Sequence, residues 1–174
     1  ATMANDIEYD DDFQVQLVDK FKNAVRRSGV SILVAETSRD DEHLVKLSPA
    51  QATTNSQGVA TFTKFKVRGP IGNLVLSFNV VGEDIAGVSI ENTLVPGPAV
   101  GLELVVAPQG VRSGVEVDVN PQIALVDSAG NHVQVTSGDV DVVANHAAKV
   151  TNGKATFGDD GLAKFKKFAV AGSV

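Results

Sequence analysis

The stretch Gly58–Gly69, GVATFTKFKVRG, occurs a second time in altered form as Gly161–Gly172, GLAKFKKFAVAG. The alignment extends without a gap over Lys46–Ile71 and Lys149–Val174, which lie 103 positions apart. A segment that is repeated in this way, with its glycines and phenylalanines kept, indicates a duplicated module.

The repeat continues upstream, where Ile7–Val25 aligns without a gap on Val115–Val133 at an offset of 108. A repeat of roughly 100 residues has the size of a whole domain. It is too long for a solenoid unit, which depends on stacked neighbours for its core. The 174 residues therefore predict two tandem domains, residues 1–96 and residues 97–174.

Short apolar runs between turn residues indicate that both copies are made of β-strands. Phe13–Val18 alternates apolar with polar residues, and similar runs recur roughly every ten residues. Valine is frequent, and such β-branched residues suit pleated, half-buried surfaces. The sequence predicts an all-β fold of two antiparallel β-sandwiches.

The spacing of the phenylalanines makes a further prediction about the core. Phe62 and Phe65 have opposite parity, so one flat strand cannot bury both rings. Phe165 and Phe168 keep this spacing. A bulge or bend between the two rings would turn the second one into the core.

Each copy ends its first alternating strand in a turn of the form Asp-x-x-x-Asn, at Asp19–Asn23 and at Asp127–Asn131. Asp and Asn favour turns because their side chains bond to nearby backbone groups. Lys22 stands where the second copy has Gly130. Glycine reaches left-handed conformations without steric cost, so we expect strain at Lys22.

The next predicted strand is Val30–Ala35 in the first copy and Val140–Ala144 in the second. These two ranges align at an offset of about 110, and the offset then falls to 103. The first copy would then carry roughly seven extra residues within Thr37–Leu44. Polar loops of this kind carry function more often than the scaffold does, although a solvated insertion remains the alternative. The predicted contact loop consists of Arg39, Asp40, Asp41, Glu42 and His43.

The two copies differ at their ends. The first shows no clear equivalent of the opening strand Leu102–Val106, so its first strand is predicted to be missing. The second has no counterpart of Asn73–Val95, so its last strands are predicted to be missing. Two explanations remain open: a piece of a longer array, or completion by a neighbouring chain at open sheet edges.

Composition and motifs argue against several functions. The net charge of −6 does not favour nucleic acid, which binds clustered Lys and Arg. No apolar run is long enough to span a bilayer, so we expect no membrane insertion. With no cysteine, no phosphate-binding loop and no nucleophile elbow, we predict neither an enzyme nor a cofactor.

Acidic clusters offer one weak metal prediction. Calcium needs six to eight converging oxygens. Consecutive acids on a strand point to opposite faces, so turn formation and solvated surface are the alternative. The calcium candidates are Asp10, Asp11, Asp12 and Asp84.

The chain resembles the bacterial immunoglobulin-like (Ig-like) repeats of the invasin and intimin type, within the broader filamin-like group. The resemblance is carried by LVDSAGNHV (Leu125–Val133), TNSQGVATF (Thr54–Phe62) and the late aliphatic strand NLVLSF. It implies antiparallel sandwiches of about seven strands each, which act as rigid spacers in cell-surface adhesins.

The leading hypothesis is thus a non-catalytic structural or adhesive module whose tandem repeats space or present a binding element of a larger cell-surface protein. The alternative is a cytoplasmic filamin-like scaffold that binds partner peptides by β-augmentation. Expected partners are other proteins or neighbouring repeats, with self-association through open sheet edges as a further prediction.

Overall fold

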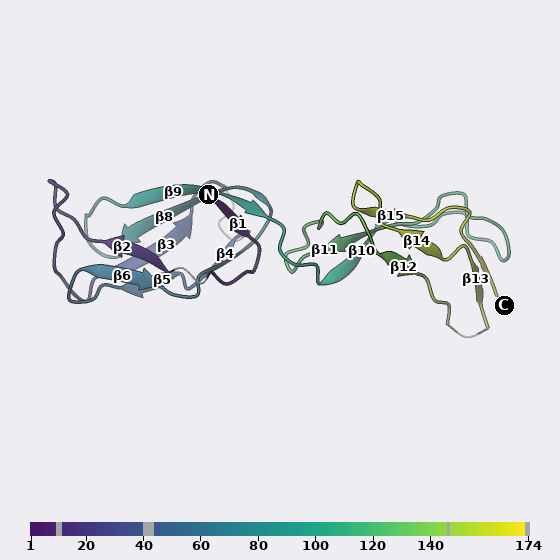
Figure 1. Ribbon diagram of the computed structural model, residues 1–174, viewed down its shortest axis with the longest axis horizontal. Coiled ribbons are helices and arrows are strands. Elements are labelled where there is room, and N and C mark those ends of the chain that lie inside the picture. Colours follow the sequence, from purple (N-terminus) through teal and green to yellow (C-terminus); the bar gives the residue numbers. More distant parts are fainter. Residues whose placement is uncertain (10–11, 40–43, 146, 173–174) are drawn as a thin grey trace. The chain divides into compact units, whose positions relative to one another are not determined.

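The computed structural model describes residues 1–9, 12–39, 44–145 and 147–172. The chain folds as two compact units, Ala1–Gly97 (unit 1) and Pro98–Val174 (unit 2). Figure 1 shows both units built from strands, which confirms the predicted all-β class. Among the described residues, no helix is long and apolar enough to cross a membrane. That each unit is a repeat able to fold alone stays a prediction.

Unit 1 is built around a five-stranded sheet with the order β1-β9-β8-β3-β5. Two further ladders, β2–β6 and β4–β7, pair the remaining strands of the unit. The inner surfaces enclose one apolar cluster that includes Phe62, Phe65, Leu74 and Leu76. The strands are β1 (Thr2–Ala4), β2 (Phe13–Gln16), β3 (Ser31–Glu36), β4 (Lys46–Ser48), β5 (Gln51–Thr53), β6 (Val59–Phe62), β7 (Lys66–Arg68), β8 (Gly72–Val80) and β9 (Val88–Val95).

Unit 2 contains a three-stranded sheet, β10-β11-β15, and the ladders β12–β14 and β13–β16. Its smaller core includes Val117, Val140, Phe157, Phe165 and Phe168. The strands are β10 (Gly101–Val106), β11 (Gln122–Val126), β12 (Asp139–Asp141), β13 (Lys149–Thr151), β14 (Lys154–Thr156), β15 (Leu162–Lys164) and β16 (Ala169–Ala171).

Strand pairing in the two units follows one register. In unit 1, β4 aligns Leu47 with Val67 of β7, and in unit 2, β13 aligns Val150 with Val170 of β16. Each partner in unit 2 therefore lies 103 positions after its counterpart. The ladders β2–β6 and β11–β15 also match in register, with an offset of 108 between β2 and β11 and of 103 between β6 and β15. The duplication seen in the sequence thus extends to the pairing of the backbones.

The register corrects the predicted length of the insertion after β3. Ile32 pairs with Ala52 in unit 1, and Val140 pairs with Ala155 in unit 2. The offset at β3 is therefore 108 rather than about 110, and unit 1 carries five extra residues rather than seven. Aligning two valine-rich runs by composition allows such a slip, whereas hydrogen-bond pairing does not.

Unit 1 opens with a short strand, β1, that is not the equivalent of Leu102–Val106 which the sequence predicts to be missing. β1 pairs in parallel with β9, and Met3 lies opposite Leu94. The strand has three residues and buries only the Met3 side chain, so no alternation marks it in the sequence. It also occupies a different place from β10, which pairs antiparallel with β11.

A bend between the paired phenylalanines brings both rings into each core. Lys64 has a φ of 54° and Lys167 a φ of 51°, so both adopt the left-handed conformation. Phe62 and Phe65 are 0% and 1% exposed, and their centroids lie 6.4 Å apart in an edge-to-face arrangement. The predicted change of direction is therefore made by one left-handed residue in each unit.

The two Asp-x-x-x-Asn turns have matching hydrogen bonds. Oδ1 of Asp19 accepts bonds from the backbone N–H groups of Phe21 (2.8 Å) and Asn23 (2.9 Å). Asp127 accepts the equivalent bonds in unit 2. Lys22 has a φ of 70° and Gly130 a φ of 85°, so the lysine occupies a backbone conformation that favours glycine.

A buried asparagine fastens the start of unit 1 to its far end. Nδ2 of Asn5 donates to the Gly69 carbonyl (2.6 Å), and Oδ1 accepts from the Gly69 N–H (2.9 Å). The Asn5 N–H donates to the Val95 carbonyl at 3.0 Å. A Cβ on Gly97 would lie 2.0 Å from the Asn5 carbonyl oxygen, so the close packing requires glycine there.

We expect Asn5→Ala to lower the free energy of unfolding of unit 1 by about 1–3 kcal/mol, because buried polar bonds are lost without replacement. Urea denaturation of the full chain, followed residue by residue by hydrogen exchange, measures this loss. Asn73→Ala is the control, since Asn73 is exposed on β8. An equal effect of both substitutions would contradict the assignment.

We expect Lys22→Gly to stabilise unit 1 by about 0.5–1 kcal/mol, because it relieves left-handed strain at the cost of some unfolded-state entropy. The reciprocal Gly130→Lys should destabilise unit 2 by a similar amount. Thermal unfolding of both variants tests the pair, and a neutral or destabilising Lys22→Gly would show that Lys22 carries no strain.

Candidate functional site

The predicted contact loop leaves β3 through a network of polar bonds to β8. The Ser38 N–H donates to Oε1 of Glu36 at 2.6 Å, and the Ser38 hydroxyl bonds to the same oxygen. That hydroxyl also donates to the Asn73 carbonyl (3.1 Å) and accepts from the Val75 N–H (3.3 Å). The start of the loop is therefore held to the five-stranded sheet.

Arg39 extends this network toward the turn before β8. Its Nη2 donates to the Pro70 carbonyl at 2.9 Å. Nη1 of Arg39 and Oε2 of Glu36 are buried, and neither atom has a hydrogen-bond partner among the residues that the structure describes. A buried carboxylate oxygen and a buried guanidinium nitrogen without partners are costly, and they retain the capacity to bind a polar group.

Only part of the predicted loop can be placed. Arg39 is half-buried at its stem, while Asp40, Asp41, Glu42 and His43 lie outside the described residues. The stem is specific to unit 1, because the register matches Glu36 with Ala144, and the segment from that position to the next strand is five residues shorter in unit 2. That the loop contacts a partner stays a prediction.

The structure places two of the four calcium candidates, Asp12 and Asp84, and these two lie apart. Asp12 immediately precedes β2, and Asp84 lies in the turn between β8 and β9, so strand direction places them at opposite ends of unit 1. Asp10 and Asp11 lie outside the described residues. Within the described ranges, no group of three His, Asp or Glu side chains could hold a metal ion.

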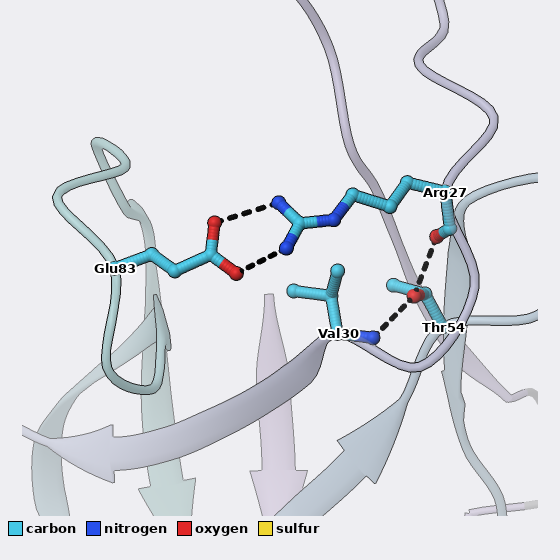
Figure 2. Close-up of polar contacts among 4 residues, drawn as sticks. All are labelled: Arg27, Val30, Thr54 and Glu83. Atoms are coloured by element: carbon cyan, nitrogen blue, oxygen red, sulfur yellow. Dashed lines mark hydrogen bonds and ion pairs between the residues drawn. The ribbon is translucent and has the colours of Figure 1, made fainter.

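A polar clamp joins the loop before β3 to the turn between β8 and β9, and no sequence pattern indicated it (Figure 2). The guanidinium of Arg27 makes two bonds to the Glu83 carboxylate, at 2.7 and 2.6 Å. The Thr54 hydroxyl donates to the Arg27 carbonyl (2.8 Å) and accepts from the Val30 N–H (3.0 Å). Arg27 and Glu83 are 56 residues apart, so no local pattern could reveal the pair.

The pKa values of the two side chains in this clamp shift in the direction that an ion pair predicts. The hydrogen bond from Arg27 lowers the pKa of Glu83, and the bond to Glu83 raises the pKa of Arg27. Both side chains reach solvent, so the pair contributes little to stability but fixes the relative position of the two loops.

Unit 2 has an open groove of about 730 Å³ beside β12 and β14. Three lysines line it, Lys154, Lys164 and Lys166. Lys154 pairs with Asp141 at 3.4 Å, and Lys164 pairs with Asp160. These partners offset much of the positive charge, so the groove is a weak candidate for an anion site.

The strand order and the buried double-layer core of unit 1 define the class of protein: an Ig-like β-sandwich. The family described as SMCHD1 Ig-like domain 6 matches residues 1–109. This match covers more than half of the chain, which therefore belongs to that Ig-like family. The narrower resemblance to the invasin and intimin type stays a prediction.

Among solved structures, the chain is similar to domains 5-6 of the S-layer protein SbsC. The identity is 17% and the TM-score 0.32, over 99% of this chain and 89% of that one. A likeness at this level carries no argument about function. No match to a curated protein was found.

We expect Arg27→Gln to raise the pKa of Glu83 toward its ordinary value, because the bond that favours the carboxylate is lost. Because the pKa of Glu83 is lowered in the folded state, the ion pair stabilises the folded state at neutral pH. Its contribution is lost as the pH falls through the folded-state pKa of Glu83. Carboxyl-carbon NMR titration measures the shift, and Arg26→Gln is the control. An unchanged Glu83 titration in Arg27→Gln would contradict the clamp.

Proposed function

We propose that the chain is a non-catalytic structural module, in which tandem Ig-like units space or present a binding element of a larger cell-surface protein. The observation that carries the proposal is the shortness of the connection between the two units. Membership in an Ig-like family is consistent with a structural, non-catalytic role.

The connection between the units is anchored at both ends. On one side, Gly97 is buried against the Asn5 backbone in unit 1. On the other, the Val100 N–H donates to the Val126 carbonyl in unit 2 at 2.8 Å. Only Pro98 and Ala99 lie between these anchors. A proline in so short a tether restricts rotation, which a spacer requires.

The matched registers of the two units support a modular array. Three ladders of unit 1, namely β2–β6, β3–β5 and β4–β7, recur in unit 2 at fixed offsets, so the same strand pairing can recur along a chain. Protein partners or neighbouring repeats fit this role better than nucleic acid does, given the net charge of −6. Extracellular or cell-surface placement is part of the proposal.

We expect the distance between labels on the two units to be narrowly distributed. The chain has no native cysteine, so Glu91→Cys and Lys149→Cys allow clean spin labelling at exposed sites. Pulsed electron resonance should give a narrow distribution, because Pro98 and Ala99 leave little freedom. Insertion of Gly-Ser-Gly-Gly between them should broaden it while both units remain folded. A wild-type distribution as broad as that of the insertion variant would overturn the spacer proposal.

A further inference from the structure

The crossing from β13 to β14 in unit 2 contains an asparagine that is followed directly by a glycine. Asn152-Gly153 is the single Asn-Gly pair in the sequence. The register that matches β13 with β4 places the pair at the positions of Pro49 and Ala50 in unit 1. The same crossing is therefore made with a side-chain amide in unit 2 and without one in unit 1.

The backbone at this crossing selects both residues. Asn152 has a φ of 53°, in the left-handed region that asparagine tolerates better than most residues with a side chain. A Cβ on Gly153 would lie 2.6 Å from Cγ1 of Val150 and 3.2 Å from the Val142 carbonyl oxygen. Close packing therefore keeps a glycine immediately after the asparagine.

This arrangement leaves a reactive pair of groups accessible. An asparagine amide can be attacked by the backbone nitrogen of the next residue, most readily when that residue is glycine, because no Cβ obstructs the approach. The Asn152 side chain is exposed. The Val142 N–H binds the Gly153 carbonyl at 2.8 Å, whereas the Gly153 N–H makes no hydrogen bond within the described part of the chain. The attacking nitrogen is therefore free to react.

The exposure of this crossing does not depend on how many strands the sheet of unit 2 contains. In unit 1, β3 has β5 on one side and β8 on the other, and β9 follows β8. With these strands in place, Pro49 is half-buried and Ala50 is exposed. The position of Asn152 thus lies at the surface in the unit with the larger sheet as well.

One hydrogen bond connects the Asn152 amide to the bend between the phenylalanines of unit 2. Its Nδ2 donates to the Lys167 carbonyl at 2.8 Å. Lys167 is the left-handed residue at which the chain turns from β15 to β16, and β16 pairs with β13. The amide therefore joins the crossing after β13 to the bend before β16, next to the ladder that these two strands form.

We propose that Asn152 is a site of spontaneous deamidation, which converts it to aspartate and isoaspartate and loosens the β13–β16 ladder. The Gly153 nitrogen loses its proton to hydroxide and attacks Cγ of Asn152. The Cγ–Nδ2 bond breaks, ammonia leaves, and a cyclic succinimide forms. Water then opens the ring. Cleavage between the nitrogen and Cγ gives aspartate, and cleavage at the backbone carbonyl gives isoaspartate. Water is the one co-reactant that is consumed.

Both products change the contacts of unit 2. Each lacks the Nδ2 donor that binds the Lys167 carbonyl, and each carries a negative charge that the amide did not have. Isoaspartate also adds a carbon atom to the main chain between β13 and β14. Unit 1 has Pro49 at this position and cannot react in the same way. The inference concerns the lifetime of unit 2 and does not depend on the spacer role.

The test incubates the folded full chain in mildly alkaline buffer and follows every asparagine by peptide mass mapping, with enzymatic methylation of isoaspartate as a second readout. We expect conversion to begin at Asn152 and to accelerate with pH, because the attacking amide must lose its proton. Asn55 is the internal control, since it is exposed but is followed by serine, and its Oδ1 accepts two backbone bonds. Asn152→Gln should abolish conversion at this position, because its longer side chain closes a less favourable ring.

A second variant separates the structural consequence from the reaction. Asn152→Asp reproduces one product and should speed hydrogen exchange of the β13–β16 amides about fivefold, the effect expected when one hydrogen bond is lost. Exchange in the β3–β8 ladder of unit 1 should not change. Asn73→Asp is the matched control, because it adds the same charge at an exposed site in unit 1 and should leave β13–β16 as in the wild type. Thermal unfolding verifies that the variants fold.

Three results would overturn the proposal. Conversion at Asn152 that is no faster than at Asn55 would show that the glycine confers no reactivity in this fold. Conversion in the urea-denatured chain but not in the folded chain would show that the bond to Lys167 protects the amide. Wild-type exchange of the β13–β16 amides in Asn152→Asp would show that the amide does not hold this ladder.

Discussion

Two phenylalanines three positions apart must both enter the core, and a left-handed residue between them makes this possible. Lys64 and Lys167 accept a conformation that costs about 1 kcal/mol for a residue with a side chain. Burial of a phenylalanine ring stabilises the folded state by roughly 1.5–3 kcal/mol. The bend also redirects the chain from β6 to β7 and from β15 to β16. Because the chain changes direction at this bend, the strands before and after it join different ladders.

The two units share this constraint and the strand pairing that goes with it. In unit 1, β8 places three large apolar side chains over the inner face, and Asn5 fastens the first strand to the far end. In unit 2, the ladders β12–β14 and β13–β16 repeat β3–β5 and β4–β7 of unit 1 in the same register.

The polar contacts of unit 1 and the short connection between the units both fit the proposed role as a spacer. The polar bonds of unit 1 hold loops at both of its ends: Ser38 and Arg39 at one, Arg27 and Glu83 at the other. The short connection through Pro98 and Ala99 suits a spacer, because it restricts rotation between the units.

The sequence by itself determined what depends on local chemistry: the duplication, the all-β class, the Asp-x-x-x-Asn turns, the left-handed site at Lys22 and the bend between the phenylalanines. These features follow from periodicity and turn preferences within a few residues. The tertiary structure alone decided the five-residue insertion, the parallel pairing of β1, the burial of Asn5 and the Arg27–Glu83 clamp. Each of these depends on groups far apart in the chain, whose meeting is set by strand register and three-dimensional packing rather than by local pattern.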